Sequence, residues 1–198
     1  MPWMTYGYGV KMTPIQILTF YNSIANDGEV VKPKFIHSTR KFGTNENKVY
    51  PKQILNKSIF SNYTNKVLKK MLYDVVHHQN GTAKNIKSKH LKLSGKTGTT
   101  QVDYTTDTIN YISSFVGYFP SDKPKYSCII VLNKPNKSKG FYGNKVAAPV
   151  FKRIAEKIFS KYPKVEEYDL NELNENIKFS KIEIKNSSSH KKIVSNGT

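Results

Sequence analysis

The sequence contains 198 residues, which is enough for one domain with a hydrophobic core and a tail. Its formal net charge of +18 is typical of proteins that bind nucleic acid or an anionic membrane surface. Arginine, however, occurs only at Arg40 and Arg153, and the lysines are scattered along the chain among many asparagines. Because proteins that read phosphates usually rely on clustered arginine forks, we predict that nucleic acid is not a partner.

The apolar residues set further limits. Every apolar run is shorter than the roughly 18 residues that a membrane-spanning helix needs, so no span or signal peptide is predicted within the sequence. The single Cys128 cannot form an internal disulfide, and its apolar surroundings favour a small buried side chain over a reactive thiol. Trp3, so close to the first residue, indicates that the chain begins inside a folded domain.

The first predicted element is an amphipathic helix between Thr13 and Gly28. Thr13 followed by Pro14 is a helix start signal, and Gly28 is a stop signal. Residues 29–38 are predicted to be extended, because Pro33 keeps the preceding residue out of the helical region. The polar residues 40–57 indicate a loop or an exposed hairpin.

A second helix is predicted from Ser58 or Ser61 to His78, ended by Asn80 and Gly81. Its apolar residues are spaced three and four apart, which predicts one buried stripe. The stripe consists of Val67, Leu68, Met71, Leu72, Val75 and Val76.

Three strands are predicted next, over residues 90–99, 111–120 and 126–135. The short turn at residues 121–125 favours antiparallel pairing of the last two. A third helix is predicted over residues 146–162, with an interruption near Pro149. Its apolar residues are Val150, Ile154, Ile158 and Phe159.

From Pro163 onward the composition shifts to weak periodicity, an acidic start and a serine-rich basic end. This segment is predicted to be a linker or an extended tail, with a connection to a further domain as one option. We therefore predict two parts, a domain over residues 1–162 and the tail over residues 163–198.

The most informative stretch reads LSGKTGTTQ, from Leu93 to Gln101. It combines a lysine, several hydroxyls and two glycines at the end of an alternating apolar run. A strand edge of this composition offers a cation, hydroxyl donors and a closely approachable backbone. These are the groups that a site for a carboxylate-bearing peptide needs.

In this frame of helices and strands the chain resembles the penicillin-binding transpeptidases, and within them the class B enzymes that cross-link peptidoglycan. K-T-G is one signature of that superfamily. Three other stretches carry the same resemblance, which covers about residues 3 to 160. They are GYGVKMTPIQILTFYNSIANDG, the GTA segment at Gly81, Thr82 and Ala83, and SSFVGYFP. The resemblance implies an α+β fold, an antiparallel β-sheet flanked by helices, as the C-terminal part of a penicillin-binding transpeptidase fold.

The resemblance also implies roles for five residues. Lys96 would place positive charge near a serine nucleophile and help proton movement. Thr97 and Thr99 would bind the terminal carboxylate of the substrate, and the backbone N–H of Thr99 would form half of an oxyanion hole. Gly98 would let the acyl group approach the strand. Gln101 matches a position beside the cleft.

Two other signatures of the superfamily, S-x-x-K and S-x-N, lack a fitting match. S-x-x-K should lie far ahead of K-T-G on a buried helix, whereas Ser38 begins a match after an extended segment and Ser188 begins one in the tail. No S-x-N triplet occurs. The chain therefore resembles a transpeptidase fragment that begins just before Trp3 and is expected to be inactive alone, since nucleophile and base act as a unit.

The resemblance implies peptidoglycan stem peptides and β-lactams as ligands, and cell-division or elongation proteins as partners. It implies a location on the extracytoplasmic, periplasmic face of the cytoplasmic membrane, through an N-terminal anchor absent from this chain. No cofactor is implied, and the spacing of the five histidines favours exposed or capping roles over a metal site. Two alternatives stay open: a non-catalytic relative that binds peptidoglycan or protein partners, and a β-lactamase or sensor domain.

Overall fold

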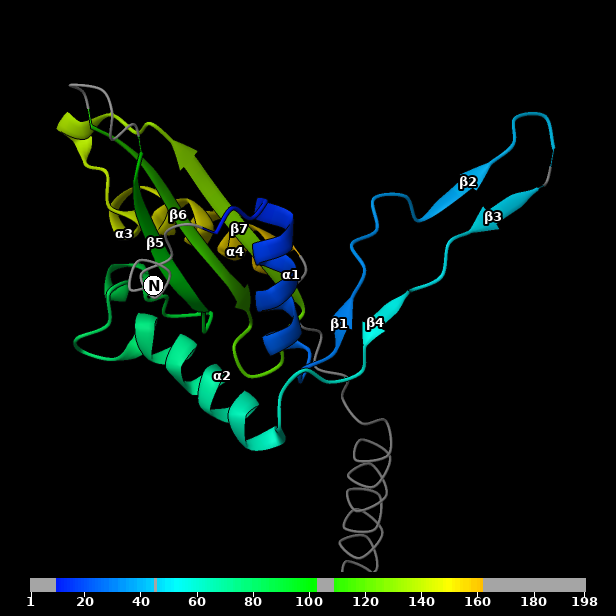
Figure 1. The fold of residues 1–198 in the computed structure, drawn as a ribbon, viewed down its shortest axis with the longest axis horizontal. Helices are drawn as coiled ribbons and strands as arrows, with labels where there is room; N and C mark the ends of the chain where they lie inside the picture. Colours follow the sequence, from blue (N-terminus) through cyan, green and yellow to red (C-terminus); the bar gives the residue numbers. More distant parts are fainter. Residues whose placement is uncertain (1–9, 45, 103–108, 162–198) are drawn as a thin grey trace, which may run out of the picture. The chain divides into compact units, whose positions relative to one another are not determined.

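A three-stranded antiparallel sheet organises the described part of the chain, which comprises residues 10–44, 46–102 and 109–161 of a computed structural model (Figure 1). The strands stand in the order β5-β6-β7, with bounds Ser94–Val102, Asn110–Phe119 and Tyr126–Asn133. The longer helices are α1 (Pro14–Ala25), α2 (Asn62–His77) and α4 (Ala148–Lys161). The predicted α+β class, an antiparallel sheet flanked by helices, is confirmed.

Helix α1 begins where the sequence predicts because its start signal is complete within four residues. The backbone N–H of Gln16 donates to the Thr13 hydroxyl, and the Gln16 side chain accepts from the Thr13 N–H at 2.8 Å. This capping box satisfies N–H groups that the first turn leaves without partners. At the other end Asp27 and Gly28 take φ values of 55° and 94°, which turn the chain away from the helix.

Helix α2 also forms as predicted, with the Ser61 hydroxyl accepting from the Thr64 N–H. The predicted stripe is wrong at Met71, whose side chain is 60% exposed. Leu72 is buried, and so is Asn65, which donates from Nδ2 to Asp27 Oδ1 at 3.1 Å. Neighbouring residues on a helix point about 100° apart, so Met71 points to the side of the face that carries the buried Asn65, Leu72 and Val76.

The two faces of the sheet have different cores, because successive side chains in a strand point to opposite faces. On one face Tyr118 is fully buried against Ile24 of α1 and Leu72 of α2. On the other face Phe115 and Phe119 contact the ring of Phe151 in α4, with centroids 4.8 and 5.7 Å apart. The sheet therefore lies between α1 and α2 on one side and α4 on the other (Figure 1).

The helix predicted over residues 146–162 corresponds to α4. A short helix α3 (Gly143–Val146) precedes α4, and the fully buried Ala147 lies between them, close to the predicted interruption. The predicted apolar stripe is wrong at Ile154, whose side chain is 36% exposed, whereas Phe151 and Ala155 are fully buried. Alanine weakens the periodic signal of this face because it carries little apolar surface, so the sequence favoured the neighbouring stripe.

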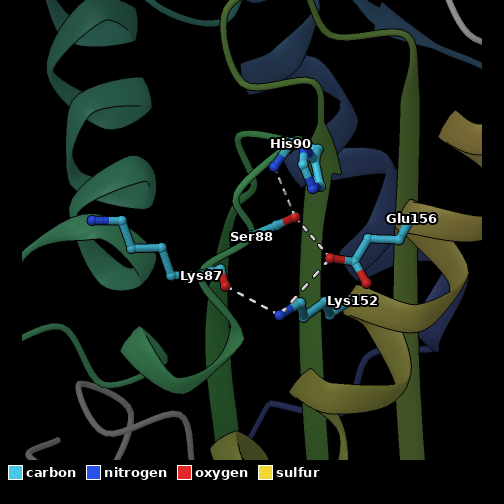
Figure 2. A network of polar contacts seen from close by, with 5 residues as sticks. All are labelled: Lys87, Ser88, His90, Lys152 and Glu156. Carbon is cyan, nitrogen blue, oxygen red and sulfur yellow. Dashed lines mark hydrogen bonds and ion pairs between the residues drawn. The ribbon is translucent and has the colours of Figure 1, made fainter.

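The segment that leads into β5 is joined to α4 by polar contacts (Figure 2). The Ser88 hydroxyl donates to Glu156 Oε1 at 2.7 Å and accepts from the His90 N–H at 3.4 Å. Lys152 Nζ donates to the carbonyl oxygen of Lys87 at 3.1 Å and lies 3.8 Å from Glu156 Oε1. Figure 2 shows that the Lys87 amine points away from this network. The contacts fix the chain shortly before the strand that carries K-T-G.

Residues between α1 and α2 form the exposed hairpin that the sequence predicts as one of two options. Two short antiparallel ladders make it (Figure 1). They pair β1 (Val30–Val31) with β4 (Ile54–Asn56), and β2 (Ser38–Arg40) with β3 (Asn47–Val49). Its apolar residues include Phe35, with 87% of its surface exposed.

Several predictions concern residues outside the described part. These are the placement of Trp3, the S-x-x-K match at Ser188 and the structure of the tail. The chain divides into two compact units, Met1–Ile158 and Phe159–Thr198, and the boundary predicted after residue 162 stays a prediction. None of the helices that the structure describes has the length and apolar character to cross a membrane.

Cys128 is half-buried in β7, and burial raises the pKa of its thiol.

The pH dependence of stability has one predicted source in His77. Its ring stacks on Tyr73 with centroids 4.0 Å apart, and burial lowers its pKa below the ordinary value of 6.5, with Lys87 and Lys92 acting in the same direction. A histidine with a lowered folded-state pKa binds protons more readily when unfolded. Its stabilising contribution is therefore present above about pH 6.5 and is lost as the pH falls through the folded-state pKa.

We expect the melting temperature to fall more between about pH 7.5 and about pH 5 in the wild type than in His77→Gln. The matched control is His78→Gln, because His78 is the exposed neighbour. Equal pH profiles for the wild type and His77→Gln would contradict this assignment.

Candidate active site

The K-T-G motif lies on β5, one of the two edge strands of the described sheet. Within this sheet β5 pairs with β6 alone. Lys96, Thr97, Gly98 and Thr99 are paired with Val116, Phe115, Ser114 and Ser113, respectively. The alternation of a strand places Lys96 and Gly98 towards one face, and Thr97 and Thr99 towards the other. A ligand at the open edge of β5 can therefore meet groups from both faces.

Lys96 supplies the cation of this edge. Its side chain is exposed, and Nζ donates to the carbonyl oxygen of Thr97 at 2.8 Å. An ammonium group has three donors, so this single bond leaves it able to bind a further acceptor.

The Thr99 hydroxyl lies against the start of α3. The backbone N–H of Gly143 donates to Thr99 Oγ1 at 3.0 Å, although the two residues are 44 positions apart. Thr99 itself is exposed. Gly143 was not among the predicted site residues. In the sequence it appears only as a glycine shortly before the predicted third helix.

The Thr97 hydroxyl lies 3.4 Å from the hydroxyl of Thr82, in the GTA segment that the resemblance singled out. Two asparagines hold that segment. Asn144 Nδ2 donates to the Thr82 carbonyl oxygen at 3.0 Å, and Asn85 Nδ2 donates to the Asn144 carbonyl oxygen at 2.8 Å. Neither asparagine was predicted, because exposed asparagines are common in this sequence and carry no periodic signal.

A Cβ atom at Gly98 would lie 2.5 Å from Ser114 Oγ on the neighbouring strand. Rotation of the Ser114 side chain relieves this contact, so packing alone does not require glycine here. The predicted approach of an acyl group past Gly98 stays a prediction.

Gln101 lies farther along β5, where it is half-buried and paired with Tyr111. Its predicted position beside a cleft stays a prediction. Among residues 10–44, 46–102 and 109–161 there is no group of three or more His, Cys, Asp or Glu side chains that could hold a metal ion.

A lysine and two threonine hydroxyls thus line the open edge of an antiparallel sheet that helices cover on both faces. This arrangement is the one expected of the penicillin-binding class of serine acyltransferases. The chain belongs to the penicillin binding protein transpeptidase domain family, which it matches over residues 2–156.

Curated relatives carry names from the same family. The chain is 31% identical over 158 residues to the peptidoglycan D,D-transpeptidase FtsI of Buchnera aphidicola subsp. Baizongia pistaciae, covering 78% of this chain and 26% of the relative. It is 30% identical over 151 residues to the stage V sporulation protein D of Bacillus subtilis, covering 75% and 23%. The chain therefore spans about a quarter of the length of these relatives.

Solved structures show the same fold. Penicillin-binding protein 3 of Mycobacterium tuberculosis matches with a TM-score of 0.67 and 28% identity, covering 78% of this chain and 36% of that chain. The same protein has been solved in complex with ampicillin. The transpeptidase domain of Burkholderia pseudomallei penicillin-binding protein 3 matches with a TM-score of 0.60 and 26% identity, covering 81% and 45%.

Proposed function

We propose that this chain is part of a peptidoglycan D,D-transpeptidase and supplies one wall of its active site. The observation that supports this most directly is the K-T-G-T run on the open edge of β5, with Lys96 and Thr99 both exposed there. The naming of relatives as peptidoglycan D,D-transpeptidases supports the same reaction. The substrates are stem peptides of peptidoglycan, and β-lactams are inhibitors that acylate the same nucleophile.

The proposed reaction has two steps. The hydroxyl oxygen of a serine attacks the carbonyl carbon between the last two D-alanines, the C–N bond breaks, and the terminal D-alanine leaves with a proton on its amine. An amine of a second stem peptide then attacks the ester, which forms the cross-link and returns the proton to the serine. Lys96 stabilises negative charge and assists proton transfer, while Thr97 and Thr99 bind the carboxylate of the departing residue.

No S-x-x-K match within the described part of this chain lies on a helix. Ser38 of the S-x-x-K match lies in β2 of the exposed hairpin, whereas the motif's nucleophile in this family lies on a buried helix. We infer that the nucleophile belongs to the part of the transpeptidase domain that precedes K-T-G in such enzymes. In the same frame we propose an extracytoplasmic location for the domain, division or elongation proteins as partners, and a tail that begins after residue 162.

The proposed function is tested by intact-mass measurement after incubation with ampicillin. We expect no covalent adduct on the 198-residue chain, and a stoichiometric acyl adduct on the complete product of its gene. A stoichiometric adduct on the chain alone would show that it carries its own nucleophile.

The fate of the adduct separates the alternatives. A long-lived adduct supports a transpeptidase, whereas rapid loss with continuous hydrolysis of ampicillin identifies a β-lactamase. A complete gene product that never forms an adduct supports the non-catalytic binding relative.

A further inference from the structure

The bond between Gly143 and Thr99 determines what the Thr99 hydroxyl can do. A threonine hydroxyl has one proton to donate and lone pairs that accept. At Thr99 a lone pair accepts from the Gly143 N–H at 3.0 Å. Because a backbone N–H can only donate, the proton of the Thr99 hydroxyl must point elsewhere, and the exposure of this side chain leaves it available to a ligand. The contact therefore favours the hydroxyl as a hydrogen-bond donor.

The position of that N–H depends on Gly143 being glycine. A Cβ atom there would lie 2.5 Å from the carbonyl oxygen of Ser114 and 2.6 Å from that of Gly98. Real Cβ atoms essentially never approach other atoms so closely, and both obstacles are backbone atoms of the sheet. Any side chain at Gly143 would therefore move the start of α3 away from β5 and lengthen the bond to Thr99.

A second set of contacts holds the same place. Asn144, the next residue of α3, donates to the Thr82 carbonyl oxygen, and its own carbonyl oxygen accepts from Asn85. Thr82 in turn lies 3.4 Å from Thr97 Oγ1. The start of α3 is thus fixed to both the GTA segment and β5, beside the two hydroxyls on one face of the strand.

We propose that Gly143 is a positioning residue, whose backbone N–H sets the Thr99 hydroxyl as the donor that recognises the carboxylate of the stem peptide or β-lactam. The inference rests on the proposed function and adds to it a group outside the K-T-G motif that controls carboxylate selectivity.

The contact between the Gly143 N–H and the Thr99 hydroxyl is tested on the 198-residue chain by amide NMR. Thr99→Val keeps the shape of the side chain and removes the acceptor, so we expect an upfield shift of the Gly143 amide proton and faster hydrogen exchange. Thr100→Val, at the exposed neighbour on β5, is the matched control and should leave Gly143 unchanged. If the chemical shift and the exchange rate of the Gly143 amide are unchanged in Thr99→Val, the proposal is wrong. This holds whether or not the protein is acylated by β-lactams.

Recognition of the carboxylate is tested on the complete gene product, by comparing the acylation rates for ampicillin and for its methyl ester. Hydrogen bonds to charged groups are the stronger ones, so Gly143→Ala should lower the rate with ampicillin about tenfold or more and change the rate with the ester little. A merely structural defect would lower both rates together. A preserved ratio of the two rates in a folded Gly143→Ala protein would refute the positioning role.

Two variants at Thr99 keep this test decisive if Gly143→Ala does not fold. Thr99→Ser retains a hydroxyl and should keep the preference for the carboxylate, whereas Thr99→Val should lose it. Equal preference in both variants would refute the role of the hydroxyl. If the wild-type gene product is not acylated at all, the proposed function fails and the carboxylate part of the inference fails with it, while the NMR result still decides the contact itself.

Discussion

Replacing Lys96 by methionine in the complete gene product is expected to slow acylation by ampicillin by about a hundredfold or more. Side chains that assist proton transfer contribute roughly 10²- to 10⁴-fold, and methionine keeps the length of the chain without its charge. The rate is measured by intact-mass spectrometry at several times of incubation. Because Lys96 is exposed at the strand edge, the melting temperature should change little.

Lys92→Met is the matched control, since Lys92 is also an exposed lysine and lies just ahead of β5. It removes the same charge from the protein, and its acylation rate should stay within about threefold of the wild type because long-range electrostatic effects are screened by salt. A Lys96→Met protein as fast as Lys92→Met would remove Lys96 from the site.

Replacing Gly117 by alanine is expected to cause a large loss of stability. A Cβ atom at Gly117 would lie 2.1 Å from the Ser94 carbonyl oxygen and 2.9 Å from Gly95 Cα, across the ladder between β6 and β5. Overpacking usually costs about 1–3 kcal/mol, occasionally more, and here the obstacle is backbone, which cannot rotate away. The strands would have to separate at the first residues of β5.

Thermal unfolding measures the effect on the 198-residue chain. In a protein of this size about 1 kcal/mol corresponds to roughly 2–4 °C in melting temperature, so Gly117→Ala should lower it by several degrees. Thr100→Ala, an exposed site on the same ladder, should stay within about 0.5 kcal/mol of the wild type. A Gly117→Ala protein that melts with the wild type would mean that the two strands tolerate a wider spacing.

Local signals determined much of the secondary structure. The start of α1 was predictable because the capping box involves Thr13 and Gln16 alone, and the same holds for the Ser61 cap of α2. Alternation and a short turn predicted the pairing of β6 with β7. These features depend on residues that are close in sequence, so the chain specifies them before any helix packs on the sheet.

The buried faces of the helices were less predictable. The stripe on α2 included the exposed Met71 and omitted the buried Asn65, and the stripe on α4 included the exposed Ile154 in place of Ala155. The spacing of apolar residues defines a broad face of a helix. Which side chains of that face are buried depends on the element that packs against it. Asn65 can be buried because Asp27, at the end of α1, accepts its hydrogen bond.

The sequence alone determined the candidate motif, because K-T-G-T is contiguous and its side chains are recognisable without a structure. Only the tertiary structure decided what surrounds it: the Gly143 N–H on Thr99, the Asn144 bond to Thr82, and Ser114 opposite Gly98. The physical reason is sequence distance. A bond between residues 44 positions apart has no periodic or local signature, and it exists because α3 packs against two backbones that accept no side chain between them.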